Sequence, residues 1–242
     1  MRASYRLVIG VAAGLLLTTP VFAQSTPGAA PGGHDAKAAA LPTYVPPMRG
    51  SPNARVSGAS RGGPLLDAPH LEVLAPDHAG ETLQEQPTFF WSTSRAIDGR
   101  VELAISAVAT ERVLYKTTIA GPRAAGIYAF SLNGTPARLD VGSEYRWSVT
   151  TLVEGADASH TVTVSGLVKR VPRSQVKLTS FPSDPNAAAI AYAKSGIWYD
   201  AVEALSLGLQ QTPADAQLHR SRAALLRQVG LPDVADFDRV GS

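Results

Sequence analysis

The chain contains no cysteine among its 242 residues. Disulfide bonds, thiolate zinc sites, iron–sulfur clusters and cysteine nucleophiles are therefore excluded. Its five histidines are scattered, and no two of them are four positions apart, the spacing that places two metal ligands on one face of a helix. On these grounds we expect no bound metal and no cofactor.

An excess of charge of either sign is also missing. The chain has 22 basic and 20 acidic residues, and two of the basic ones, Arg2 and Arg6, fall in a predicted signal peptide. A chain with balanced charge lacks the basic footprint on which nucleic-acid binding depends. No glycine-rich loop precedes a helix in the pattern that cradles phosphates. We therefore expect neither a nucleic-acid partner nor a bound nucleotide.

Residues 1–23 have the pattern of a signal peptide. A basic start precedes an apolar run from Leu7 to Leu17, and small residues precede a cleavage site after Ala23. Because the run is shorter than the roughly 20 residues that span a bilayer, we expect a mature chain that begins at Gln24 and has no stable membrane span. The prediction is an exported protein, periplasmic or extracellular; the alternative is an uncleaved anchor.

Two segments of low complexity follow. Residues 24–47 are rich in Ala, Gly and Pro and are predicted to be a disordered linker, because they cannot bury enough apolar surface to offset the entropy of ordering. Residues 48–69 form an arm rich in Arg, Gly and Ser, with Arg49, Arg55 and Arg61 as candidate partner-binding residues. Two interpretations stay open: a solvated linker, or an arm that docks on the domain or on an anionic partner.

Two patterns suggest catalysis, and neither is specific. Gly58–Gly62 matches the G-x-S-x-G motif of hydrolases, but no strand is predicted before it and no helix after it, so it does not predict a nucleophile elbow. Asp67, His70, Asp77 and His78 cluster ahead of the β domain and are the best acid–base or metal candidates. A polar turn explains these residues more simply.

Residues 70–179 have the signature of an antiparallel β-sandwich, with short segments rich in β-branched and aromatic residues between Gly, Pro, Asp and Asn. The predicted strands are Leu71–Leu74, Thr82–Ser92, Arg100–Ala107, Arg112–Ile119, Gly126–Leu132, Glu144–Leu152 and Thr161–Arg170. Alternation places Tyr145, Trp147 and Val149 on the core face. Seven such strands are typical of immunoglobulin-like or fibronectin type III domains.

Two details refine that prediction. Leu139 and Gly142 precede Tyr145 as in the tyrosine corner of immunoglobulin-like sandwiches. Phe89, Phe90 and Trp91 are adjacent, so their side chains point to opposite faces and both faces of that strand are apolar. We therefore expect another element to cover the outer face.

Residues 180–242 switch to a helical pattern. Asp184 can cap a helix that begins at Pro185, Gly196 marks a turn, and the spacing after it resembles a tetratricopeptide (TPR)-like hairpin. One further helix is predicted over Ala214–Val229. Trp198 and Tyr199 allow two interpretations: they pack the helices on the sandwich over the Phe90 face, or they bind a partner.

The order of these motifs resembles one protein family. The arm that ends in Ser60-Arg61-Gly62, the strand Pro87–Trp91, the run Leu139–Trp147 and the turn Gly196–Ala201 together look like domain-of-unknown-function family 928, a group of exported bacterial proteins, many of them cyanobacterial. The resemblance covers about Val45 to the end. It implies that the arm belongs to the domain, and it supplies no catalytic residue, cofactor or partner. Family members often carry two cysteines that this chain lacks.

The sequence therefore predicts a mainly β protein with an α-helical C-terminal unit. Its predicted function is that of an exported, non-catalytic interaction module that binds a protein or another envelope component. The alternative is an envelope hydrolase or small-ligand-binding protein that uses the Asp77/His78 loop.

Overall fold

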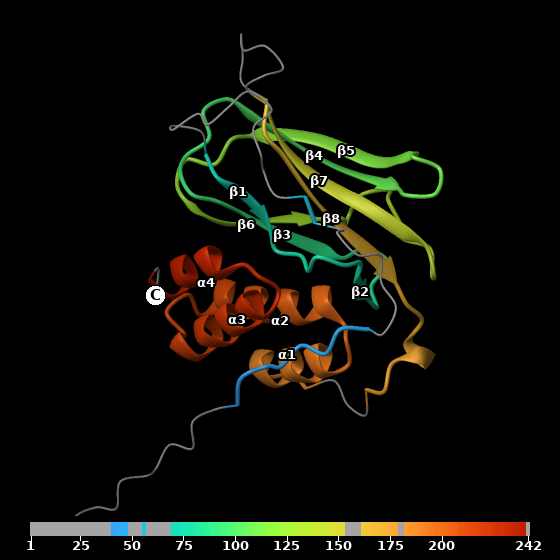
Figure 1. The fold of residues 1–242 in the computed structure, drawn as a ribbon, viewed down its shortest axis with the longest axis vertical. Coiled ribbons are helices and arrows are strands. Elements are labelled where there is room, and N and C mark those ends of the chain that lie inside the picture. Colours follow the sequence, from blue (N-terminus) through green and yellow to red (C-terminus); the bar gives the residue numbers. More distant parts are fainter. Residues whose placement is uncertain (1–39, 48–54, 57–68, 153–160, 179–181, 241–242) are drawn as a thin grey trace, which may run out of the picture. The chain divides into compact units, whose positions relative to one another are not determined.

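The computed structural model describes residues 40–47, 55–56, 69–152, 161–178 and 182–240 (Figure 1). Within these ranges eight strands form two sheets, and four helices follow them. The predicted signal peptide, most of the predicted linker, and Arg49, Arg61 and Gly58–Gly62 of the arm lie outside the described residues. The chain is thus mainly β with a helical C-terminal unit, as the sequence predicts.

The two sheets have three and five strands. The three-stranded sheet has the order β1 (Leu71–Val73), β3 (Thr88–Thr93), β6 (Gly126–Ser131). The five-stranded sheet has the order β2 (Gly80–Thr82), β8 (Thr163–Arg170), β7 (Glu144–Leu152), β4 (Arg100–Ala107), β5 (Val113–Ala120). All neighbours are antiparallel except β2 and β8.

The alternation in β7 predicts its buried face correctly. Tyr145, Trp147 and Val149 are buried, while the residues between them are partly exposed. The ring of Phe89 on β3 stacks on the ring of Trp147 with centroids 4.8 Å apart. This contact joins the two sheets across a shared apolar core.

One predicted strand is wrong. Thr82–Ser92 is divided between β2, in the five-stranded sheet, and β3, in the three-stranded sheet. The residues between them cross from one sheet to the other, and Pro87 among them has no backbone N–H for a ladder. The prediction of a purely antiparallel sandwich is also wrong, because β2 pairs parallel to β8. This pairing joins segments more than 80 positions apart, and no local pattern reveals it.

The helical unit has one more helix than predicted. Its members are α1 (Pro185–Lys194), α2 (Trp198–Gln211), α3 (Ala216–Gln228) and α4 (Pro232–Val240). Asp184 caps α1 as predicted, since its side chain accepts a hydrogen bond from the Ala187 N–H at 2.7 Å. The sequence does not reveal α4, because a buried ion pair from Asp238 to Arg222 on α3 helps to anchor this short helix.

Helix α2 covers the outer face of β3, which confirms the expectation drawn from Phe89–Trp91. The side chain of Phe89 faces Trp147 between the sheets, whereas Phe90 lies beside Ser206 and Leu209 of α2. All three aromatic side chains of this strand are buried. The sandwich and the helices therefore share one hydrophobic core.

Contacts with the helical unit begin within the predicted linker, before its predicted end at residue 47. Tyr44 is buried, and its ring meets the ring of Trp198 edge-on with centroids 4.9 Å apart. Its backbone N–H donates to Gln228 Oε1 at 2.8 Å, and the Val45 N–H donates to the Ala193 carbonyl at 3.0 Å. Residues 40–47 thus lie along the helical unit, because one aromatic anchor and backbone hydrogen bonds offset the cost of ordering them.

Candidate interaction groove

The junction between the sandwich and α2 fixes the position of the helical unit. Trp198 Nε1 donates to the Leu74 carbonyl at 2.9 Å. The Tyr199 hydroxyl accepts from Trp147 Nε1 at 2.9 Å and donates to the Leu167 carbonyl at 2.8 Å. Both side chains are buried within the chain. The prediction of Trp198 and Tyr199 as partner-binding residues is therefore corrected: they pack the helices on the sandwich, which was the other interpretation.

Asp200 adds a buried carboxyl group to the same junction. Its Oδ2 accepts from Thr82 Oγ1 at 2.7 Å and from the Leu83 N–H at 3.2 Å. Burial raises the pKa of Asp200 to about 7, although both hydrogen bonds act in the opposite direction. Sequence analysis missed this residue, because its only sign was an acidic side chain in the first turn of a helix.

Arg55 of the predicted arm docks on the domain. Its guanidinium donates from Nη1 to the carbonyls of Ala75 at 3.1 Å and Val229 at 2.8 Å, and from Nη2 to that of Gly230 at 3.3 Å. One side chain thus bridges the sandwich and the helical unit. Val56, the next residue, pairs with Ser165 of β8 in an isolated antiparallel bridge. At Arg55 the structure favours docking of the arm on the domain over a solvated linker.

Asp77 and His78 lie between β1 and β2, Asp77 at a bend and His78 in a β-bridge. His78 Nε2 is 2.9 Å from the Tyr44 hydroxyl, and the two rings stack with centroids 5.8 Å apart. The Asp77 side chain is 80% exposed and lies 3.3 Å from His78 Nδ1. The alternative function needs a cleft around this pair, and neither residue lines the groove described below. These contacts explain the two residues as an attachment point for residues 40–47.

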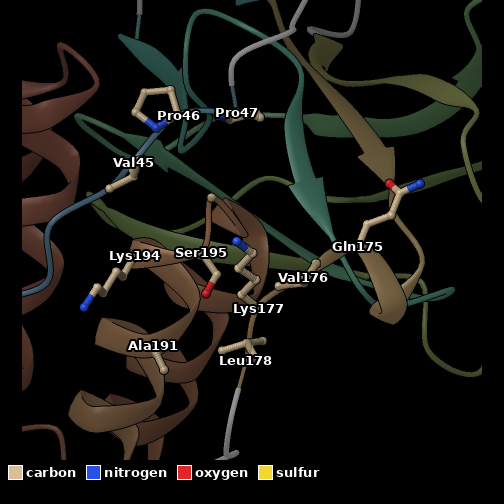
Figure 2. Close-up of a pocket in the computed structure, with 11 residues that line it drawn as sticks. Val45, Pro46, Pro47, Gln175, Val176, Lys177, Leu178, Ala191, Lys194 and Ser195 are labelled. Carbon is tan, nitrogen blue, oxygen red and sulfur yellow. The ribbon is translucent and has the colours of Figure 1, made fainter.

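A groove lies where residues 45–47, the end of α1 and the segment after β8 meet (Figure 2). Its volume is about 840 Å³. The segment after β8 contains a short 3-10 helix, Arg173–Gln175, and continues along the groove to Leu178. Gly196, at φ 80°, turns the chain out of α1, and a Cβ there would lie 3.1 Å from the Val45 carbonyl oxygen. The glycine thus lets residues 45–47 pass close to the helix end.

The groove has an apolar lining and a basic charge. Its apolar residues are Val45, Pro46, Pro47, Val176, Leu178 and Ala191. Lys177 and Lys194 also line it, and none of the described residues that line it is acidic. In Figure 2 the ammonium group of Lys177 reaches toward Ser195, whereas that of Lys194 extends outward from the helix. Such a surface can hold an extended chain by apolar contacts and pair its carboxylates with the lysines.

Sequence analysis did not identify this groove. Lys177 follows the last strand and Lys194 ends a helix, so the two lysines come from segments that were predicted as parts of separate domains. The pair Pro46-Pro47 was visible, but it was assigned to the linker. Only the docking of residues 40–47 brings the three segments together.

The described residues contain no group of three or more His, Cys, Asp or Glu side chains arranged to hold a metal ion. In the same part of the chain, no helix is both long enough and apolar enough to cross a bilayer.

The fold and groove together define a two-sheet β protein with an attached helical unit and an open basic surface. A model of the family described as Domain of Unknown Function (DUF928) matches residues 56–238. The chain therefore belongs to this family, as the order of its motifs suggests. A search of curated proteins finds no match.

Solved structures show only weak likeness. The C-terminal domain of wzt matches with 18% identity over 54% of this chain and 81% of that one, at a TM-score of 0.26. A Parabacteroides merdae β-glucuronidase with glycerol in its active site matches with 14% identity over 48% of this chain and 14% of that one, at 0.25. A multi-domain immunophilin from Arabidopsis thaliana has 8% identity over 82% and 99% of the respective chains, at 0.17.

Proposed function

We propose that the protein is an exported, non-catalytic interaction module that binds an extended, acidic segment of a partner protein in the cell envelope. The observation that carries the proposal is the groove beside α1, which combines an apolar lining with Lys177 and Lys194 and, among the residues that the structure describes, no acidic side chain. Pro46 and Pro47 have no backbone N–H, so recognition there depends on side-chain contacts and on charge rather than on strand pairing.

The predicted partner-binding residue Arg49 supports the same charge preference. It follows Pro47 by two positions in the sequence and lies outside the described residues, so its charge is proposed from the sequence alone to add to that of the two lysines. Complementary charge speeds association and discriminates against basic partners. An acidic segment is accordingly favoured over a neutral one.

The sandwich is proposed to be of the immunoglobulin or fibronectin type III kind. If β1, β3, β4, β5, β6, β7 and β8 are labelled A, B, C, C′, E, F and G, the sheets are A-B-E and G-F-C-C′, with β2 as an additional strand beside G. This grouping is typical of such sandwiches without strand D. The Asp140 N–H also donates to the Tyr145 hydroxyl at 2.9 Å, as in a tyrosine corner.

The first two helices are proposed to form a TPR-like hairpin. A Cβ at Gly208 would lie 2.8 Å from Leu218 Cδ1 and from Pro185 Cβ. The glycine on α2 thus permits close contact with α1 and α3, as small residues do in stacked helical repeats. In this proposal the hairpin supports the groove and is itself a packing element.

The basic charge of the groove predicts how partner binding changes when its two lysines are replaced by glutamate. We expect the double variant Lys177→Glu/Lys194→Glu to lose at least about tenfold in affinity for the partner, because attraction of an acidic segment becomes repulsion. The measurement is quantitative affinity capture from an envelope extract, with mass spectrometry of the proteins retained by the wild type and by the variant.

The matched control is Arg112→Glu, at an exposed position in the β4–β5 connection. It introduces an acidic side chain without touching the groove and is expected to leave capture unchanged. Equal retention of every protein by the wild type and the double variant would remove the groove from the proposed function.

The proposed export predicts the N-terminal residue of the mature protein. The secreted protein is expected to begin at Gln24, as read by N-terminal sequencing. Leu16→Arg places a charge within the apolar run and is expected to leave the chain unprocessed in the cytoplasm, whereas Ala30→Arg, beyond the cleavage site, is expected to be processed normally. Wild-type protein that keeps residues 1–23 would contradict the prediction.

A further inference from the structure

Strand β5 is an edge of the five-stranded sheet, and its outer side has no partner strand within the described residues. In Figure 1 it forms the border of that sheet, with β4 as its neighbour. Four strands lie at sheet edges in the described ranges: β1 and β2 have three residues each, β6 has six and β5 has eight. β5 therefore offers the longest row of backbone N–H and C=O groups for pairing with a strand of another chain.

Strand β5 lacks the features that commonly protect an exposed edge, which are proline, free lysine side chains and bulges within the strand. It contains no proline, and its one charged side chain, Lys116, has its ammonium group 2.6 Å from Glu102 Oε2 of β4. The register shift against β4 comes at the first residues of β5, and the pairing from Tyr115 to Ala120 is regular. This stretch can therefore accept a second strand along its whole length.

The core-facing side of this edge is only partly covered. Three side chains of β5 share the core face, because their partners on β4 are buried: Tyr115, Thr117 and Ile119. The Tyr115 ring stacks on the Phe130 ring with centroids 6.3 Å apart, but Ile119 is 38% exposed. A strand added at this edge would remove such apolar surface from water, which favours the pairing.

We propose that β5 pairs antiparallel with β5 of a second copy of the chain, so that the two five-stranded sheets become one continuous sheet. A twofold axis perpendicular to the sheet makes the two strands antiparallel and keeps both core faces on the same side. Since opposite residues then belong to the same face, the axis passes through one residue position of β5. The groove and β5 share no residue, so this pairing does not depend on the proposed function.

The side chains of β5 select one register. With the axis at Thr117, Tyr115 lies opposite Ile119 of the second copy, and aromatic and β-branched residues form favourable pairs across antiparallel strands. On the outer face, Lys116 then lies opposite Thr118 of the second copy. With the axis at Lys116, two lysines would lie directly opposite each other, which is destabilising. The register centred on Thr117 is therefore the favoured one.

The first test is sedimentation equilibrium of the purified protein. We expect a dimer with a dissociation constant of about 10 μM, because the pairing of one strand buries an area at the low end for specific interfaces. Ile119→Lys places a free cation at the edge and is expected to weaken dimerisation at least about tenfold. Val108→Lys, at a 40% exposed position outside β5, is the matched control and is expected to dimerise as the wild type does. A wild type that stays monomeric at about 100 μM would overturn the proposal.

The absence of cysteine from the chain allows a direct test of the register. Thr117→Cys sets two thiols opposite each other at the axis, so mild oxidation is expected to link the dimer by a disulfide, seen on a non-reducing gel. Thr118→Cys is the matched control, since Thr118 is also partly exposed on β5. Its two thiols would lie about 7 Å apart along the strand in addition to the spacing between strands, which is beyond the reach of a disulfide.

The control is therefore expected to give at least about tenfold less linked dimer than Thr117→Cys. Equal linking of the two variants, or a dimer that Thr117→Cys does not link, would contradict pairing through β5 in this register. If Ile119→Lys fails to fold, the comparison of the two cysteine variants decides.

Discussion

Replacing Tyr199 by alanine is expected to lower the free energy of unfolding by about 5 kcal/mol. The substitution removes a fully buried aromatic side chain that meets the Phe89 ring edge-on at 5.3 Å. It also leaves the Trp147 indole N–H and the Leu167 carbonyl without their partner in the buried core. Urea denaturation, followed by tryptophan fluorescence and by circular dichroism, measures the effect.

Tyr199→Phe separates the two contributions. It keeps the ring and removes only the hydroxyl, so we expect a loss of about 2 kcal/mol from two broken buried hydrogen bonds. Tyr128→Phe is the matched control, since its hydroxyl donates to the Ala124 carbonyl at an exposed site, and its loss should stay below about 0.5 kcal/mol. If Tyr199→Phe is as stable as the Tyr128 variant, the hydroxyl does not hold the helices on the sandwich.

Asp200→Asn is expected to change how stability depends on pH. Burial raises the pKa of Asp200 in the folded state to about 7, so between about pH 4 and pH 7 the folded state holds a proton that the unfolded state has lost. Wild-type stability therefore falls as pH rises from about 4 to 7, by about 4 kcal/mol at 1.4 kcal/mol per pKa unit. Asparagine stays neutral and can still accept from Thr82 and Leu83 through its carbonyl oxygen, so the variant lacks this slope.

The measurement is urea denaturation of the wild type and the variant between pH 4 and pH 8. Near pH 4 the two should be similar, and at pH 8 Asp200→Asn should be the more stable by a few kcal/mol. Asp184→Asn is the matched control, because Asp184 is an exposed helix cap and asparagine caps almost equally well. A parallel pH dependence in the wild type and Asp200→Asn would show that this carboxyl stays ionised in the folded protein.

Much of the fold could be predicted because its signals are local. Alternation in β7 depends only on neighbouring positions, and the adjacent aromatic residues Phe89–Trp91 already required a cover on the second face. Asp184 and Gly196 act within one turn of the chain, so the start of α1 and the turn after it follow from the sequence. In each case the residues that cause the structural feature are close neighbours in the sequence, so a local pattern is enough to predict it.

The errors arise where distant segments decide the structure. The three residues of β2 form a strand because β8 accepts them as a parallel neighbour. Helix α4 is anchored in part through Asp238, whose partners lie on α3. Tyr44 orders the end of the predicted linker by packing on Trp198. None of these contacts produces a repeating pattern of residues that could be recognised in the sequence.

The candidate sites show the same difference between local sequence signals and contacts of distant segments. The sequence offers Trp198 and Tyr199 either for packing or for partner binding, and only the structure shows that both are buried. Lys177 and Lys194 are ordinary surface cations in the sequence, and they become a pair only when residues 45–47 close the groove between them. A groove built from three separate segments cannot be recognised from any one of them.

The most direct test of the proposed groove is site-specific photo-crosslinking in living cells, with a benzophenone amino acid at Ala191 in the groove. The control position is Val113, which is 55% exposed on β5. The account predicts a discrete adduct from Ala191, a crosslinked partner peptide containing Asp or Glu, and loss of the adduct in Lys177→Glu/Lys194→Glu. No adduct at Ala191, or an adduct that survives the double variant unchanged, would contradict it.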